Sequence, residues 1–356
     1  MNVKKTLRGF AVVGALILTA VIVAALLPAR TPVIKDGEGK VLPESIARIQ
    51  KIEIGGVSQY LMIRGNDIGN PVLLFVHGGP GQAEIGYIRE VQKELEERFV
   101  VVRWDQRGAG LSASDEVPAE SLTTETLVSD ADEITDYLIK TFGQPKIYIA
   151  GHSWGTVIAT KAVYAHPEKY RAYIGAGQFV DAQKGEVLSY EYALAEARRQ
   201  QNPEVLEQLK AIGTPPYSAE KFLIRAQCLS RLGCVFHTPP ELNMGKALML
   251  SSEYTLPAKL KYMKNGHLSA ERLAPEILKV NFLGEIEELR VPVYFIMGKH
   301  DYFTPTALAE QFCDQLQAPS KELIVFEDSA HVPQLEEPGR FNRTLIRILE
   351  ETGEPQ

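Results

Sequence analysis

The segment IYIAGHSWGTVIATKA, residues 147–162, decides the fold of this chain. Its first four residues form an apolar run typical of a buried strand, and residues 156–162 predict a helix. Between them stands Gly-x-Ser-x-Gly, the pattern of a sharp, strained strand-to-helix turn that presents a serine hydroxyl. Glycine is needed at both ends because a side chain there would collide with the neighbouring strand or helix. The alternative is a glycine-rich turn that only packs tightly.

Strands and helices alternate on both sides of this segment. Apolar runs predict strands at 72–76, 99–102, 172–174, 291–297 and 323–326. Apolar residues at helical spacing predict helices at 127–138, 306–316 and 338–351. Two segments of alternating character, 46–54 and 59–65, predict an antiparallel pair at a sheet edge. This rhythm predicts an α/β fold with a mostly parallel sheet and helices on both faces, which carries its sites at the carboxyl ends of the strands.

The rhythm is interrupted once. Residues 46–180 and 283–356 predict the two parts of the α/β core, and the helical, proline-interrupted residues 181–282 predict a cap inserted over the strand ends. Residues 31–45 are rich in proline and glycine, and they predict a linker.

Residues 1–30 have a different composition. The run from Phe10 to Leu27 is apolar, long enough to cross about 30 Å of hydrocarbon, and longer than the core of a signal peptide. Three basic residues within the first eight positions precede it. We therefore expect a single-pass transmembrane helix with a cytoplasmic N-terminus and an extracytoplasmic body. Cleavage after Ala29, which would release a secreted form, and a buried core helix are the alternatives.

Charge and cysteine content narrow the possible partners. The formal net charge is −7, and no basic cluster follows the first residues, so we expect no nucleic-acid partner. Cys228 and Cys234 are close enough in sequence for a local disulfide, with two buried thiols as the alternative. Cys313 is predicted to be a core residue.

Two later motifs supply partners for Ser153. Asp301 follows the strand predicted at 291–297, and His331 follows the strand predicted at 323–326. A serine hydroxyl needs a base to take its proton, and the base needs a carboxylate to orient it. The order Ser, Asp, His, each after a separate strand, is that of an α/β-hydrolase. We therefore predict a triad of Ser153, Asp301 and His331, which requires no metal and no cofactor.

Other polar residues near the motifs are predicted to be structural. His77 is expected to brace its loop, and His152 is expected to pack inside the turn. Asp105 precedes the turn in sequence and stands between Arg103 and Arg107, so the expectation for it is an ion pair with them.

Two backbone N–H groups are predicted to stabilise an oxyanion. One belongs to Trp154, which directly follows the serine. The second comes from the loop after the strand at 72–76, where Gly79 is the first choice and Gly78 the alternate. A simple tight turn is the other interpretation of this loop.

Three motifs carry a family resemblance. HGGPG at 77–81, DQRGAG at 105–110 and GHSWG at 151–155, in this order, resemble the proline iminopeptidase family of serine peptidases in the α/β-hydrolase superfamily, over about residues 45–350. The resemblance implies a hydrolase that releases an N-terminal residue, often proline, from a small-molecule or short peptide substrate. Ala109 stands where members of the family often have cysteine.

The family resemblance also implies that cap carboxylates hold the free amine of the substrate. Glu186, Glu191 and Glu196 are candidates for this substrate-binding role, with Glu191 the residue named for it, although no motif selects one. The sequence thus predicts a serine aminopeptidase. The alternatives are an esterase or amidase acting on small acyl substrates, and a ligand-binding protein that retains a hydrolase pocket without turnover. Dehalogenases and epoxide hydrolases are disfavoured because they use a carboxylate nucleophile.

Overall fold

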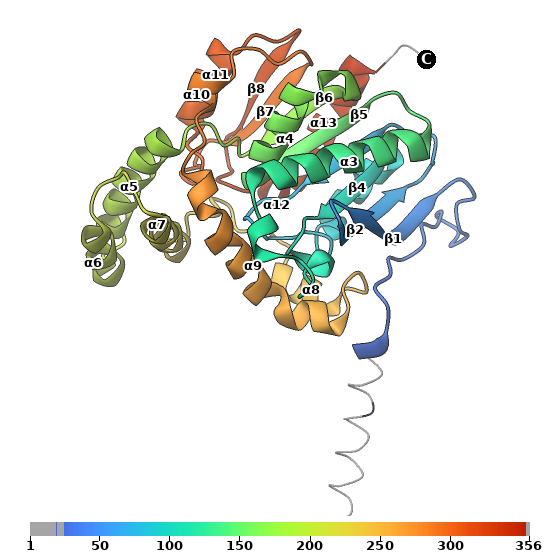
Figure 1. The fold of residues 1–356 in the computed structure, drawn as a ribbon, viewed down its shortest axis with the longest axis horizontal. Helices are drawn as coiled ribbons and strands as arrows, with labels where there is room; N and C mark the ends of the chain where they lie inside the picture. The colour runs from blue at the N-terminus through green and yellow to red at the C-terminus, as the bar shows by residue number, and fades with distance from the viewer. Residues whose placement is uncertain (1–18, 20–24, 354–356) are drawn as a thin grey trace, which may run out of the picture.

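The computed structural model describes residue 19 and residues 25–353. Its centre is an eight-stranded sheet in the order β1-β2-β4-β3-β5-β6-β7-β8 (Figure 1). The β1–β2 and β2–β4 pairs are antiparallel, and the pairs from β4 through β3, β5, β6 and β7 to β8 are parallel. The predicted edge pair and the mostly parallel sheet are both confirmed. The strands are β1 (Ile46–Ile54), β2 (Val57–Gly65), β3 (Val72–Val76), β4 (Val100–Asp105), β5 (Ile147–His152), β6 (Tyr170–Ala176), β7 (Val293–Gly298) and β8 (Lys321–Phe326).

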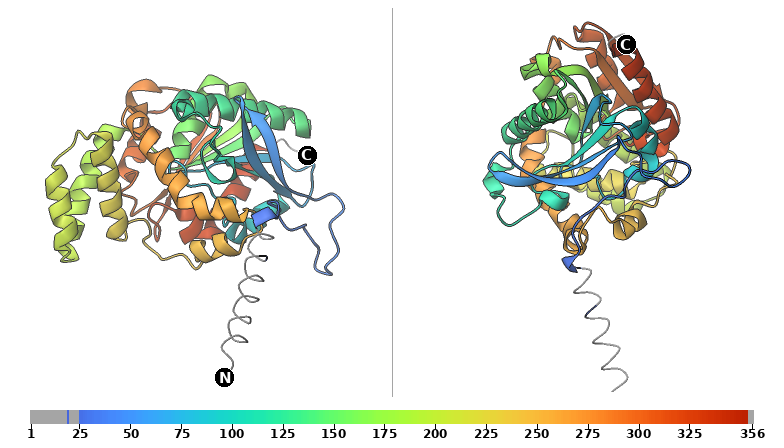
Figure 2. Two further views of the ribbon diagram at one scale, coloured as in Figure 1. Left: turned by 60° about the horizontal axis from the view of Figure 1, so that its bottom comes forward. Right: turned by 90° about the vertical axis from the view of Figure 1, so that its right-hand side faces the viewer.

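Helices cover both faces of the sheet (Figures 1 and 2). Helices α3, α4 and α11 pack on one face, and α13 packs on the other. The α-helices are α2 (Arg89–Gln92), α3 (Thr124–Phe142), α4 (Trp154–Ala165), α5 (Ala182–Arg199), α6 (Pro203–Ile212), α7 (Ala219–Arg231), α8 (Met244–Leu250), α9 (Leu256–Ile277), α10 (Phe282–Glu285), α11 (Thr306–Gln315), α12 (Pro333–Glu336) and α13 (Pro338–Thr352).

The central strands are apolar throughout because both of their faces are covered. In β3, Leu74 and Val76 belong to the hydrophobic cluster under α3 and α4, whereas Leu73 and Phe75 belong to the cluster under α13. Successive side chains of a strand point to opposite faces, so a strand covered on both sides needs an unbroken apolar run. Such runs are what made these strands predictable.

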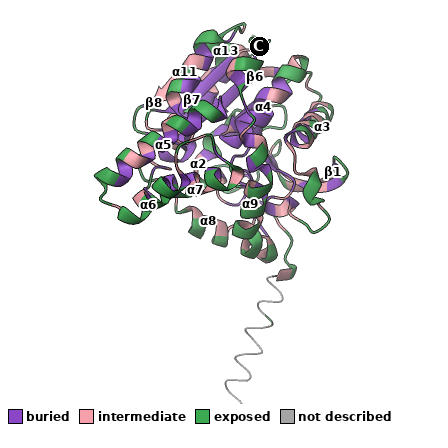
Figure 3. Ribbon diagram, turned by 60° about the vertical axis from the view of Figure 1, so that its left-hand side comes forward, coloured by how far each residue is buried: buried purple, intermediate pink, exposed green. Residues whose placement is uncertain are grey.

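Helices α5 to α9 occupy residues 182–277, between β6 and β7, where the sequence predicts the cap. Figure 1 shows α5, α6 and α7 together at the left of the view, with α9 running down to α8 at the bottom. The central strands are buried, while the outer sides of the cap helices are exposed (Figure 3). The inner sides of α5, α6, α7 and α9 belong to the same hydrophobic cluster as one face of the sheet.

The predicted transmembrane helix, Phe10 to Leu27, lies outside the described residues apart from Thr19 and residues 25–27. Among residue 19 and residues 25–353, no helix is both long enough and apolar enough to span a bilayer.

The segment 31–45, predicted to be a linker, is packed on the body at its start. Thr31 is buried, and Arg64 donates hydrogen bonds to its hydroxyl and to the carbonyl oxygen of Pro32. Arg64 is itself buried in an ion pair with Glu96 at 2.7 Å. A buried guanidinium needs more acceptors than one carboxylate supplies, and the N-terminal segment provides them. The first residues of the predicted linker are therefore packed against the body.

Candidate active site

β5 passes into α4 through a turn that two glycines make possible. Ser153, at the turn, has φ 51° and ψ −121°, which few residues with a side chain adopt. A Cβ atom on Gly155 would lie 2.0 Å from the carbonyl oxygen of Val76, and one on Gly151 would lie 2.6 Å from the carbonyl oxygen of Gly155. The turn is therefore strained and tightly packed against β3, as the Gly-x-Ser-x-Gly pattern predicts.

The three residues of the predicted triad meet at the carboxyl ends of β5, β7 and β8. His331 Nε2 lies 2.9 Å from Ser153 Oγ, and His331 Nδ1 lies 2.9 Å from Asp301 Oδ2. A carboxylate can only accept, so Nδ1 carries a proton. In the singly protonated ring Nε2 is then the acceptor for the serine hydroxyl. This is the geometry that a base-activated serine requires.

The surroundings of Asp301 hold it in its ionised form. Oδ1 accepts from the backbone N–H groups of Phe303 and Thr304 at 2.8 and 2.9 Å, and Oδ2 accepts from the Thr304 hydroxyl at 2.7 Å. Burial acts to raise the pKa of Asp301, but the imidazole of His331 and the hydrogen bonds from Thr304 outweigh it and lower the pKa below its usual value. Sequence reasoning missed Thr304, although the Asp-x-x-Thr spacing typical of a local turn was a usable signal.

His77 joins two of the three sequence motifs, which confirms its bracing role. Its Nδ1 lies 2.9 Å from the carbonyl oxygen of Gly78, and its Nε2 accepts the backbone N–H of Gln106 at 3.2 Å. The Gln106 side chain in turn donates to the carbonyl oxygen of His77 at 2.7 Å. Burial lowers the pKa of His77 to about 4, so the ring stays neutral and keeps Nδ1 as donor. The HGGPG loop is thus tied to the DQRGAG loop.

The residues predicted to bind an oxyanion lie beside Ser153. A Cβ atom on Gly78 would be 3.0 Å from the Cβ of Ser153. Gly79 has φ 117°, which glycine alone adopts without strain. Trp154 is the first residue of α4, so its N–H has no acceptor within the helix. Gly78 therefore lies beside Ser153, and the oxyanion role of the Gly79 and Trp154 N–H groups stays a prediction.

His152 contacts the triad from within the turn. Its Nε2 lies 2.9 Å from the carbonyl oxygen of His331, and because a carbonyl only accepts, Nε2 carries the proton. Burial and the nearby His331 lower the pKa of His152 to about 3, so the ring is neutral. Its Nδ1 faces Glu84 Oε1 at 3.9 Å. His152 therefore packs, as predicted, and it also holds the backbone of His331.

The predicted ion pair between Asp105 and its flanking arginines is wrong. Arg103 pairs with Glu84 at 3.2 Å, and Arg107 pairs with Asp130 at 2.6 Å. Both pairs are buried, and each carboxylate comes from a separate segment of the chain. Neither Glu84 nor Asp130 carried a signal in the sequence, because their roles depend on long-range packing.

Asp105 has uncharged partners instead. It accepts hydrogen bonds from the backbone N–H of Leu111 at 2.8 Å and from the hydroxyl of Tyr254 at 3.0 Å. Burial raises the pKa of Asp105 to about 7. This carboxyl group is joined to the cap through Tyr254, and it has no contact with His331.

The cap is closed over the site in this structure. Tyr262 of α9 donates a hydrogen bond to the carbonyl oxygen of Ala83 at 2.7 Å. The backbone N–H of His331 donates to the carbonyl oxygen of Val235 at 3.2 Å. Ser153 is only 9% exposed. Ser153 therefore has little surface accessible to a substrate in this structure.

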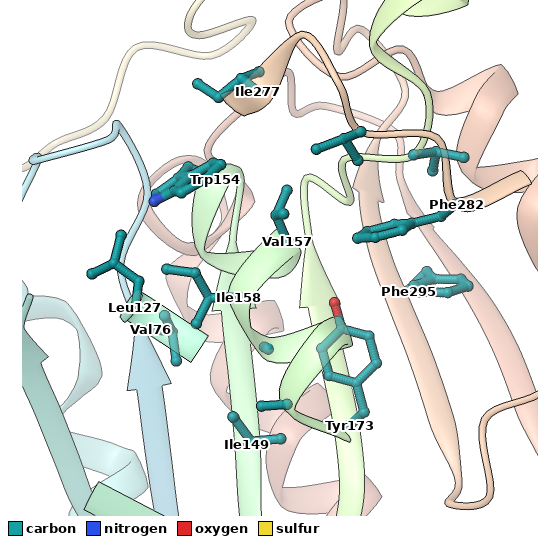
Figure 4. Close-up of a cluster of buried hydrophobic side chains, with 14 of the residues drawn as sticks. Val76, Leu127, Ile149, Trp154, Val157, Ile158, Tyr173, Ile277, Phe282 and Phe295 are labelled. Atoms are coloured by element: carbon teal, nitrogen blue, oxygen red, sulfur yellow. The ribbon is translucent and has the colours of Figure 1, made fainter. Parts of the chain in front are cut away.

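The surface of α4 under the cap is apolar. Trp154 and Val157 of α4 belong to one hydrophobic cluster with Leu127 of α3 and Ile277 of α9 (Figure 4). The Trp154 indole N–H is buried without a hydrogen-bond partner among the residues that the structure describes. These apolar contacts hold the end of α9 against the N-terminal end of α4.

The candidate cap carboxylates differ in their surroundings. Glu186 is buried in an ion pair with Arg225, and Glu196 pairs with Arg199. Glu191 is exposed on α5. No contact described here joins any of the three to Ser153.

Cys228, Cys234 and Cys313 are buried free thiols. Of the two alternatives for the first pair, the structure therefore has the thiols and not the disulfide.

Comparison with known proteins agrees with the fold. A family model described as alpha/beta hydrolase fold matches residues 71–338. The probable aminopeptidase YbaC of Bacillus subtilis (strain 168) is 36% identical over 312 residues, which are 86% of this chain and 98% of that protein. The proline iminopeptidase of Clostridium botulinum (strain Hall) is 26% identical, over 82% of this chain and 94% of that protein.

Among solved structures, a membrane phospholipase A described as a bacterial virulence factor has a TM-score of 0.62 at 19% identity. The match covers 99% of this chain and 100% of that chain. At this identity the likeness concerns the fold alone.

Proposed function

Because this chain belongs to the α/β-hydrolase family, we propose that it is a serine aminopeptidase with Ser153 as nucleophile, His331 as base and Asp301 as orienting carboxylate. One observation carries the proposal. The three side chains form an unbroken hydrogen-bonded line, with 2.9 Å on each side of the imidazole. A serine on a strained turn, an imidazole and a buried carboxylate in one hydrogen-bonded line are the arrangement that a base-activated serine needs.

The acylation step follows from the geometry. Ser153 Oγ attacks the carbonyl carbon of the scissile amide while His331 Nε2 takes the hydroxyl proton. The oxyanion of the tetrahedral intermediate accepts hydrogen bonds from the N–H groups of Gly79 and Trp154. The imidazolium, stabilised by Asp301, then gives its proton to the leaving amine. An ester remains between the serine and the N-terminal residue of the substrate.

Deacylation repeats the sequence with water. His331 Nε2 removes a proton from the water as it attacks the ester carbonyl, and the same N–H groups hold the oxyanion. Collapse of this intermediate returns the proton to Ser153 Oγ and releases the free amino acid. No group beyond the described residues and water takes part in either step.

Three observations favour an aminopeptidase over other serine hydrolases. The relative with 36% identity is named a probable aminopeptidase, and the resemblance of the three motifs is to proline iminopeptidases. A serine with 9% exposure beneath a cap also suits the end of a short peptide better than the interior of a folded protein.

Of the three cap carboxylates, Glu191 is the one outside the described ion pairs, and we keep it as the proposed contact for the substrate amine.

We also propose, from the sequence, that residues 10–27 anchor the chain in a membrane with the body on the extracytoplasmic side. The full chain should stay with the membrane fraction during a high-salt wash and leave it only in detergent. Release by salt would contradict an anchor.

The activity is tested with a panel of chromogenic aminoacyl amides and short acyl esters. We expect the full chain to cleave unblocked prolyl or alanyl amides and to leave N-blocked analogues intact. Ser153→Ala should abolish this cleavage, while Ser230→Ala, at an exposed serine of α7, should leave it unchanged. Cleavage of esters only would refute the peptidase assignment but keep the triad. A protein that binds these substrates without hydrolysis would refute the triad mechanism.

A further inference from the structure

The end of α8 and the first half of α9 expose large apolar side chains. Met249 and Leu250 are 50% and 74% exposed, and Leu260 and Met263 are 71% and 79% exposed. Leu260 and Met263 are three residues apart on α9 and so lie on one side of the helix. Lys259 joins the two helices by donating to the carbonyl oxygens of Met249 and Ser251. These side chains therefore belong to one continuous surface.

The segment that carries these side chains is rich in lysine, although the whole chain is acidic and Glu90 and Glu241 line a pocket with Lys246 and Leu250. Between residues 244 and 264 there are four lysines and one acidic residue, Glu253, which is buried and paired with Arg89. Lys246, Lys261 and Lys264 are exposed and form no ion pair with any residue that the structure describes. We call Met249, Leu250, Leu260 and Met263 together with these three lysines the α8–α9 face. Apolar side chains flanked by lysines are typical of a helix that lies in a membrane interface.

The chain enters the body beside the α8–α9 face (Figures 1 and 2). The backbone N–H of Arg30 donates to the carbonyl oxygen of Ser252, two residues after Leu250. Leu26 and Leu27, the last residues of the apolar run, are 78% and 52% exposed. Three residues separate Leu27 from the hydrogen bond at Arg30, and three extended residues span at most about 10 Å.

We propose that the α8–α9 face lies in the headgroup layer of an anionic lipid bilayer. This inference rests on the proposed anchor, because an apolar run that ends at Leu27 leaves the body no more than about 10 Å from the lipid. The lysines supply the charge complement to anionic headgroups, and the exposed Leu and Met side chains reach the acyl boundary. A second protein as occupant explains the apolar side chains but not their position at the chain entry.

Fluorescence quenching in a bilayer tests the placement. A thiol-reactive fluorophore is attached to the full chain carrying Met263→Cys, and the three native cysteines are buried and do not compete. The protein is reconstituted into bilayers of phosphatidylcholine and phosphatidylglycerol that contain lipids with brominated acyl chains. Tyr164→Cys is the matched control, since Tyr164 is 56% exposed near the end of α4, away from the cap.

We expect severalfold quenching at position 263 and none at position 164. A chain that stays in the bilayer without quenching at 263 overturns the α8–α9 placement and leaves the anchor intact. A chain that is not retained in the bilayer overturns the anchor and this inference together. Hydrolytic activity is independent of each of these outcomes.

Charge variants give a second test. Each lysine near an anionic surface favours the docked state about fivefold, so Lys261→Gln with Lys264→Gln should shift the equilibrium about 25-fold and remove most of the quenching at 263. Lys51→Gln with Lys146→Gln, at exposed lysines elsewhere, should leave the quenching unchanged. Equal quenching in both double variants would refute the role of the lysines.

Discussion

Replacing Gly155 by alanine tests whether the tight packing of the turn between β5 and α4 holds Ser153 in place. The added Cβ atom would lie 2.0 Å from the carbonyl oxygen of Val76 and 2.7 Å from that of His77. Ordinary contact begins at 3.4 Å, so the nearer pair must separate by 1.4 Å. Both obstacles are backbone atoms, and β3 is fixed between β4 and β5. The head of α4, with Ser153, must therefore move.

This movement should affect chemistry more than folding. The Ser153 Oγ to His331 Nε2 distance of 2.9 Å cannot survive a displacement of that size. A misplacement of about 1 Å lowers a rate about 10²-fold, so we expect kcat for an aminoacyl amide to fall at least about 100-fold. Overpacking of a buried site costs about 1–3 kcal/mol, which should lower Tm by a few degrees.

The assay combines steady-state kinetics, labelling of the serine with a fluorophosphonate, and a thermal melt. Gly185→Ala in α5 is the matched control because its Cβ would be 3.7 Å from its nearest neighbour. It should keep kcat and gain about 0.5–1 kcal/mol of stability, as expected for alanine in place of glycine within a helix. If Gly155→Ala keeps kcat within about threefold at native Tm, the argument that the turn positions the nucleophile is refuted.

Three further predictions concern buried charges. Asp301→Asn should lower kcat about 10⁴-fold with an unchanged fold, because the imidazole loses its orienting acceptor; a loss below about tenfold in kinetic assays would contradict this. Asp105 has its pKa raised from 3.8 to about 7 in the folded chain, so the unfolded chain ionises first and stability falls as pH rises through that window. Asp105→Asn should remove this fall. In denaturant titrations from about pH 4 to pH 7, the free energy of unfolding of the variant should therefore rise relative to that of the wild type, by at most about 4 kcal/mol. Arg225→Met leaves the Glu186 carboxylate buried without its partner and should cost about 3–5 kcal/mol in urea unfolding, whereas unchanged stability would show that the pair is solvated.

Local patterns made the core of the site predictable. The turn between β5 and α4 was predictable from GHSWG, because the need for glycine there arises largely from residues nearby in sequence. The buried strands were predictable from unbroken apolar runs. The order of Ser153, Asp301 and His331 after separate strands was enough to bring them together, because parallel strands end at the same edge of a sheet. The strands, the turn and the positions of these three residues are therefore predictable from local sequence and its order along the chain.

Contacts between remote segments were not predictable in this way. Arg103 stands two residues from Asp105 but pairs with Glu84, 19 residues earlier, and Asp105 accepts from Tyr254, 149 residues later. The segment 31–45 has the composition of a spacer, yet Thr31 and Pro32 satisfy the buried guanidinium of Arg64. A buried polar group takes whichever partner the packed chain places beside it, and short-range sequence says nothing about that partner.

The sequence by itself therefore determined which segments are strands and helices and which three residues are proposed as the triad, since these follow from periodicity, glycine positions and strand order. Only the tertiary structure decided that the cap closes over Ser153, that His152 holds the backbone of His331, and that the start of the chain packs beside α8 and α9. The physical reason is that burial and hydrogen-bond partners are set by the whole packed chain, whereas strand and turn preferences are set by neighbours in sequence.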